Sequence, residues 1–121
     1  MGPWPEMNWT IPYAFKERFY SSGLNGEVFV REDANKRPLD SRTDLHHYAA
    51  TFEWGNDTEG AMQLSLALLA DAVANDAIAQ SLHQKFKRRV IIDLPERWTI
   101  TRSRILAHAR MLERSSNWIT G

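Results

Sequence analysis

A run of apolar and small residues in the middle of the chain, residues 60–74, dominates the hydrophobic pattern. Only Gln63, Ser65 and Asp71 interrupt it, so a helix here is apolar around most of its circumference and has to be buried. At about 1.5 Å per residue this helix reaches roughly 20 Å, short of the ~30 Å hydrocarbon core of a membrane. The pattern therefore predicts a central core helix and no membrane span.

Two amphipathic stretches come after this run. Asn75 and Asp76 interrupt the apolar pattern, and we expect them to end the first helix and begin a second over residues 77–93, which Pro95 ends. A third helix is expected from Arg102 to about residue 113. The apolar residues expected to face the core recur at helical spacing: Ile78, Leu82, Phe86 and Val90 in the second helix, and Ile105, Ala109 and Leu112 in the third.

The segment before the central run has β-like character. Short alternating stretches at residues 17–20 and 27–31, separated by a turn with two glycines, predict a hairpin. A second turn is expected over residues 33–36, and the segment after this turn fits a third strand or an extended loop. Trp54, which precedes the central helix, and Phe86 are predicted core residues.

The chain has 121 residues, which suits one domain. Residues 1–15 contain three prolines and four aromatic residues, and we interpret them as an N-terminal arm on a domain spanning residues 16–121. The predicted fold class is α+β, with a small antiparallel sheet in the N-terminal half packed on a helical hairpin and a third, C-terminal helix. Without cysteines, disulfides are excluded, and without a visible signal sequence we expect a cytoplasmic protein.

Several short motifs resemble a family of small bacterial domains of unknown function. The resemblance spans roughly residues 17–107 and implies a shared fold and an origin on plasmids, prophages or integrative elements. In that family the loop before the central helix is usually rich in glycine, whereas here residues 56–59 read NDTE, which argues against anion binding by this loop. The motifs that carry the resemblance are RPLD (37–40), the pair DL (44–45), FEWG (52–55), Gly60, QL (63–64), LLAD (68–71), FK (86–87), LP (94–95) and Trp98-x-Ile100-Thr101, in which x is any residue.

The net charge of zero conceals two halves of opposite sign. Residues 1–84 contain six basic and twelve acidic residues, a net charge of −6, whereas residues 85–121 contain nine basic and three acidic ones, a net charge of +6. A fold that pairs the halves neutralises this charge internally. A fold that keeps the basic helices on an outer face leaves a patch for phosphate or for an acidic protein.

The chain offers little for catalysis. His46 and His47, with Asp40, Asp44 and Glu53 nearby in sequence, suggest a metal site, but adjacent residues of a strand point to opposite faces. Glu53 between Phe52 and Trp54 suggests a desolvated general acid, although a structural role in a turn or an ion pair is the simpler interpretation. His83 and His108 are expected at the surface. We therefore expect no metal, no cofactor and no catalytic residue, and a small metal-dependent enzyme is the weakest of three alternatives.

The leading prediction is a non-catalytic accessory protein of a mobile genetic element that acts by binding a protein, for example as an inhibitor of a host defence complex. Its contact surface is expected to combine Trp4 and Trp9 with Arg102, Arg104 and Arg110, because Trp and Arg dominate binding energies. Alternatively, the arm folds back on its own domain or onto a second copy in a homodimer. The second function class is a nucleic-acid-associated module that uses the basic run Lys85, Lys87, Arg88 and Arg89.

Overall fold

The computed structural model describes residues 16–120, with side chains from residue 16 to residue 114. Trp4 and Trp9 lie outside the described residues, so the interpretation of residues 1–15 as a binding arm stays a prediction. None of the helices in the described part of the chain is long and apolar enough to cross a membrane.

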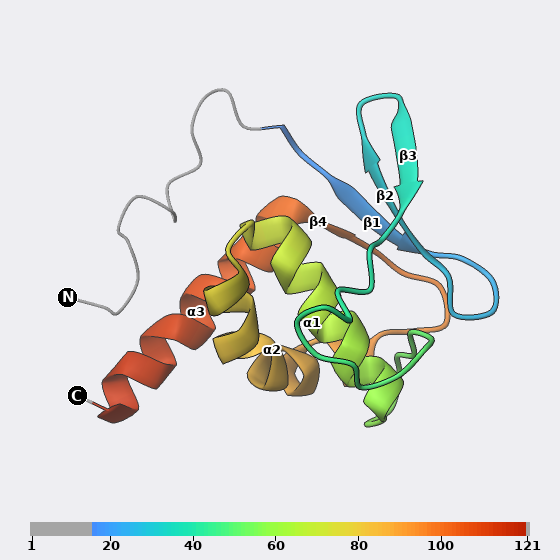
Figure 1. Cartoon of the computed structure of the whole chain (residues 1–121). Helices are drawn as coiled ribbons and strands as arrows, with labels where there is room; N and C mark the ends of the chain where they lie inside the picture. Colours follow the sequence, from blue (N-terminus) through green and yellow to red (C-terminus); the bar gives the residue numbers. More distant parts are fainter. Residues whose placement is uncertain (1–15, 121) are drawn as a thin grey trace.

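A four-stranded antiparallel sheet forms one layer of the fold, and three helices form the other (Figure 1). The α+β prediction is therefore confirmed. The strand order is β3-β2-β1-β4, so β3 and β4 are the two edges. The strands are β1 (Phe19–Ser22), β2 (Val28–Glu32), β3 (Asn35–Pro38) and β4 (Thr99–Thr101), and the helices are α1 (Glu59–Val73), α2 (Asp76–Arg89) and α3 (Arg102–Thr120), with a short 3-10 turn, η1 (Ile91–Asp93), after α2.

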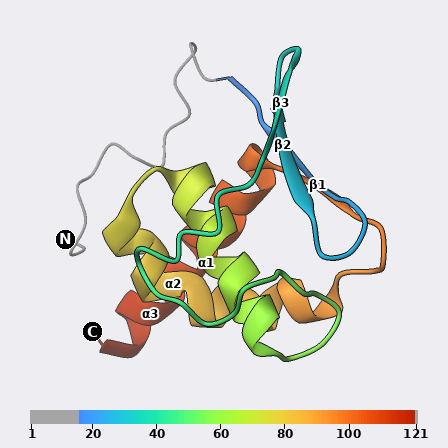
Figure 2. The ribbon, with the colours of Figure 1, turned by 45° about the vertical axis from the view of Figure 1, so that its right-hand side comes forward.

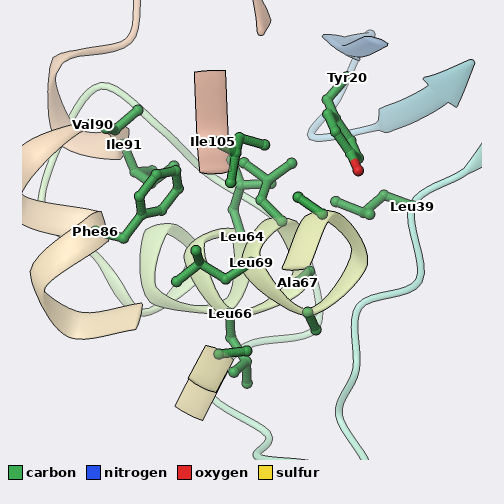
Figure 3. Packing of buried hydrophobic residues seen from close by; sticks show 14 of the residues in the cluster. Tyr20, Leu39, Leu64, Leu66, Ala67, Leu69, Phe86, Val90, Ile91 and Ile105 are labelled. Atoms are coloured by element: carbon green, nitrogen blue, oxygen red, sulfur yellow. The ribbon is translucent and has the colours of Figure 1, made fainter. Parts of the chain in front are cut away.

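The hydrophobic core surrounds α1. All residues of this helix from Gly60 to Ala72 are buried except Met62 and Asp71, which confirms the prediction of a buried central helix. Figure 3 shows Leu64 and Leu69 of α1 between Phe86 on one side and Tyr20 on the other. In the sheet, alternate residues face this core: Tyr20, Val28 and Val30 are buried.

The helix boundaries have identifiable causes. Thr58 caps α1 by accepting a hydrogen bond from the Ala61 N–H at 3.2 Å, and Asn75 caps α2 by accepting one from Ile78 at 3.0 Å. Ala74, not Asn75, adopts the left-handed conformation between the helices, with φ 59°. The expected third helix is longer than predicted: α3 continues to Thr120, because no glycine or proline interrupts residues 102–120.

Two details of the sheet differ from the expectation. The second turn is shorter than residues 33–36, because Asn35 and Lys36 already belong to β3 and pair with Glu32 and Arg31. The fourth strand, β4, comes from the far end of the chain and pairs with β1, with Ile100 opposite Tyr20.

Of the two predicted core aromatics, Phe86 is fully buried and Trp54 is only partly buried. Trp54 lies at the rim, where its indole N–H donates to the Glu96 carbonyl at 3.1 Å and its ring meets the Trp98 ring edge to face. Trp98, with 7% of its surface exposed, is the more deeply buried of the two tryptophans. It comes directly before β4, and its carbonyl accepts from the N–H of Ser22 at the end of β1, so the closing of the sheet draws it into the core.

Candidate functional site

Among the described residues, most ion pairs join groups within the acidic half. Arg18 and Arg37 of the acidic half pair with Asp71 of the same half, at 2.8 and 2.7 Å, and Arg42 pairs with Asp44 and Asp76. One pair that joins the halves is Lys87 with Asp57, at 2.5 Å. In the described part of the chain, the guanidinium groups of Arg88, Arg97, Arg104 and Arg110 form no hydrogen bond or ion pair, so their positive charge faces outward.

A groove of about 490 Å³ lies between β4, the end of α2 and the first turns of α3. Its lining combines apolar and cationic groups and includes no carboxylate. Val90 is buried and Leu94 and Ile100 are partly buried, so they form an apolar floor. We call this feature the cationic groove; its lining residues are Arg89, Val90, Leu94, Thr99, Ile100, Thr101, Arg104 and His108.

The cations of the groove are held by neighbouring side chains. Arg89 donates from Nε to Nδ1 of His108 at 3.2 Å, and its Nη2 lies 3.9 Å from the sulfur of Met111, which is half exposed. Because a guanidinium only donates, His108 is neutral here and carries its proton on Nε2. Burial, followed by the charges of Arg89 and Arg104, lowers the pKa of His108 below its ordinary value. The groove is therefore cationic through its arginines and offers an imidazole N–H.

The backbone of β4 adds polar groups to this groove. Ser22 N–H donates to the Trp98 carbonyl at 3.1 Å, and Arg102 N–H donates to the Arg18 carbonyl at 2.8 Å. Antiparallel ladders alternate, so Ile100 directs its N–H and C=O toward β1, and Thr99 and Thr101 direct theirs away. Thr101 also caps α3, accepting from the Arg104 N–H at 3.2 Å. The edge therefore presents the N–H groups of both threonines and the C=O of Thr99.

A second hollow continues this surface around the end of the sheet. It shares Thr99 with the cationic groove and is also lined by Arg97 and by Leu24, whose surface is 75% exposed. Leu24 occupies the turn between β1 and β2, seen at the right of Figure 2. The surface from Leu24 to Met111 thus places exposed apolar side chains at both ends of a cationic stretch.

The structure separates the arginines predicted for the protein-binding surface. Arg104 lines the cationic groove. Arg110 is exposed on α3 but does not line it. Arg102 is half-buried, and its Nε donates to the Ala72 carbonyl at 2.9 Å, so it ties α3 to the end of α1.

The predicted basic run is divided in the same way. Lys87 is 7% exposed and paired with Asp57, which removes it from any phosphate-contacting surface. Arg88 is exposed, Lys85 is half-buried, and Arg89 lines the cationic groove. The helix α2 buries one face, so four cations in five positions cannot all face a ligand.

His83 and His46 contact the Tyr48 side chain, whereas His47 does not take part in this cluster. His83 is 6% exposed, so the expectation of a surface histidine is wrong. Its Nδ1 lies 2.8 Å from the Gln80 carbonyl, and its Nε2 accepts from the Tyr48 hydroxyl at 2.7 Å. His46 stacks on the Tyr48 ring, with 4.0 Å between ring centroids. His47 is exposed.

The carboxylates that the sequence suggests as partners for His46 and His47 have other contacts. Asp40 accepts from the Arg42 backbone at 2.9 Å, and Asp44 pairs with the Arg42 side chain. Among the described residues, no three His, Asp or Glu side chains form a group able to hold a metal ion. Glu53 is exposed and lies over Gly60, where an added Cβ would come within 2.7 Å of its Cγ, so it is not enclosed between aromatic rings.

Asp71 joins the sheet to the central helix. It accepts hydrogen bonds from Arg18, Arg37 and the Tyr20 hydroxyl, at 2.7 to 2.8 Å. Burial acts to raise the pKa of Asp71, but these hydrogen bonds and the charges of Arg37 and Arg18 outweigh it and leave the pKa lowered. This carboxylate is held by three donors, two from the sheet strands β1 and β3 and one from Arg18 beside β1.

Sequence reasoning missed the most distinctive feature of the surface, the open edge of β4 beside Arg89. No pattern in the sequence shows that β4 and Arg89 are neighbours in space. The alternation of apolar and polar residues over 98–101 was the one available signal for a strand there.

Comparisons with known proteins identify a family of unknown function. Residues 20–111, more than half of the chain, match DUF6166, a family of unknown function, and the chain therefore belongs to this family. No curated protein and no solved structure matches the chain. The expected association with mobile elements is a separate matter and stays a prediction.

Proposed function

We propose that this member of the DUF6166 family is a non-catalytic binding protein that contacts an acidic surface of a partner protein through the cationic groove. The single observation that carries this proposal is a hollow with an apolar floor and two arginines and no carboxylate in its lining. The polar clusters around Asp71 and His83 are occupied by contacts within the fold. Such binding would serve an accessory protein of a mobile element, for example one that inhibits a host defence complex.

A protein partner suits this groove better than a nucleic acid does. A polypeptide supplies both carboxylates for Arg89 and Arg104 and apolar side chains for the floor formed by Val90, Leu94 and Ile100. A phosphate backbone supplies only the charge, and sequence-independent binding to it requires many exposed cations along a path. Burial of Lys87 shortens that path.

The test measures binding of fluorescent polyglutamate, duplex DNA and single-stranded RNA over a range of salt concentrations. The groove variant is Arg89→Glu/Arg104→Glu, and the matched control is Arg88→Glu/Arg110→Glu. Both double variants change the net charge equally and alter the same two helices, but neither Arg88 nor Arg110 lines the groove.

We expect polyglutamate to bind the wild type and the control, and to bind the groove variant about tenfold more weakly or worse. Equal weakening in both variants would show a diffuse basic field and refute the groove as the binding site. Tighter binding of DNA or RNA, with a steep dependence on salt, would replace the proposal with the nucleic-acid alternative.

A further inference from the structure

The two edges of the sheet are not equally open to another strand. At β3, Leu39 N–H donates to the Val28 carbonyl at 2.9 Å, so by alternation Lys36 and Pro38 direct their backbone groups outward. Pro38 has no N–H, which leaves Lys36 as the donor of that edge, and a lysine and a proline are typical of edges protected against pairing. The edge at β4 contains neither residue.

The open edge of β4 coincides with the cationic groove. The outward N–H groups of Thr99 and Thr101 and the C=O of Thr99 lie on the strand that forms one wall of the groove. Ile100, between them, points its side chain toward the core side, where Val90 and Leu94 complete the floor. An unpaired edge, an apolar floor and two arginines therefore occur at one place.

We propose that the partner segment binds as a fifth strand, antiparallel to β4, with an apolar residue opposite Ile100 and acidic residues two positions to either side. This inference rests on the function proposed for the groove and specifies how the partner is recognised. Cross-strand neighbours share a face of the sheet, so the residue opposite Ile100 enters the floor of the groove. The residues two positions away on the same face reach toward Arg89 and Arg104. The residues between them pair with both main-chain groups of Thr99 and with the N–H of Thr101.

Three capped, fluorescent peptides test this geometry. The first has the sequence Glu-Thr-Val-Thr-Glu, the second replaces both Glu by Lys, and the third retains Glu but is N-methylated at both Thr. In the proposed register the methylated nitrogens are those that face β4, whereas all charges and side chains of the first peptide are retained. Binding is measured by anisotropy with the full-length chain. Amide exchange at Thr99 and Thr101 is followed by NMR, with Lys36 on the other edge as the internal control.

We expect the first peptide to bind, the Lys peptide not to bind, and the N-methylated peptide to bind at least about tenfold more weakly, because it loses main-chain hydrogen bonds. Amide exchange should slow at Thr99 and Thr101 but not at Lys36. Equal affinity for the methylated and unmethylated peptides, together with weakened binding by Arg89→Glu/Arg104→Glu, would overturn strand addition and leave the proposed function standing. If the first peptide does not bind at about 1 mM, strand addition is overturned. The binding of polyglutamate to the wild type and to the groove variant tests the proposed function independently.

Discussion

Gln63 provides a sharp test of how this fold is held together. The segment of residues 39–58 crosses α1 without forming a helix or strand (Figure 1). The Gln63 side chain is fully buried on α1 and uses its whole hydrogen-bonding capacity on this segment. Its Oε1 accepts from the N–H groups of Tyr48 and Ala49 at 2.6 and 3.2 Å, and its Nε2 donates to the carbonyls of Ser41 and His46 at 2.7 and 3.0 Å.

Replacing Gln63 with Leu keeps a similar volume and removes all four hydrogen bonds. Each contributes about 0.5 to 1.5 kcal/mol net, so the variant should lose about 2 to 6 kcal/mol of unfolding free energy. We expect the lower part of this range, because the half-buried segment can bind water in place of the amide. A loss of about 3 kcal/mol is a large part of the 5 to 15 kcal/mol typical of a domain.

Urea unfolding followed by circular dichroism measures this loss. With a urea slope of about 1 to 3 kcal/mol/M, the midpoint should fall by roughly 1 to 3 M. Gln84→Leu is the matched control, because Gln84 is exposed on α2 and its replacement should change stability by less than about 0.5 kcal/mol. A loss below about 1 kcal/mol in Gln63→Leu would refute the view that this side chain holds the segment.

Gln63→Glu separates the two halves of the interaction. The carboxylate of the variant still accepts hydrogen bonds from the N–H groups of Tyr48 and Ala49. At neutral pH its second oxygen cannot donate, so the hydrogen bonds to the carbonyls of Ser41 and His46 are lost. Burial and these carbonyls favour the protonated acid, so its folded-state pKa should exceed the unfolded value of about 4.3. The variant should therefore regain stability as pH falls through that raised pKa.

Five other substitutions test four separate features by the same unfolding measurement. Asp71→Asn should cost about 2 to 4 kcal/mol at neutral pH, because it breaks partly buried ion pairs, and a cost under about 1 kcal/mol would contradict this. Trp98→Ala should cost about 3 to 5 kcal/mol and Trp54→Ala clearly less, since only the former is buried; the reverse order would show the core to be misassigned. Ala74→Gly should stabilise by about 1 kcal/mol, because the residue has φ 59°, and no gain would mean that the alanine is unstrained. Burial lowers the pKa of His83, so below about pH 6.5 the unfolded state binds a proton before the folded state does, and the wild type should lose stability. His83→Gln should lose less stability over the same pH range. Identical pH profiles of stability for the two proteins would exclude His83 as a contributor.

Local patterns were sufficient to predict the helices but not the whole sheet. A helix as apolar as α1 has to be buried. The spacing of Ile78, Leu82 and Phe86 determines which face of α2 is apolar. By contrast, β4 has three residues, and its partner β1 lies about eighty residues earlier. Such a short strand is stabilised by tertiary contacts, and the alternation of residues 98–101 does not identify its partner strand.

The positions of polar residues were the least predictable part. Nothing local shows that His83 faces inward, because its burial depends on the Tyr48 hydroxyl, which another segment supplies. Likewise the burial of Lys87 depends on Asp57, thirty residues earlier. Charge composition left open whether the basic residues pair internally or form an outer patch, and only the tertiary structure distinguishes the paired Lys87 from Arg89 in the groove.

The motifs that carry the family resemblance have structural explanations, and this bears on where function resides. Arg37 of RPLD and Asp71 of LLAD form the ion pair between the sheet and the central helix, and Gln63 of the QL pair binds the crossing segment. These internal polar groups hold the sheet, the central helix and the crossing segment together. On the surface, Thr101 of the Trp98-x-Ile100-Thr101 motif and the neighbouring Thr99 turn part of their backbone away from the sheet, beside Arg104. The peptide experiment therefore examines a motif whose backbone polar groups the sheet does not fully use.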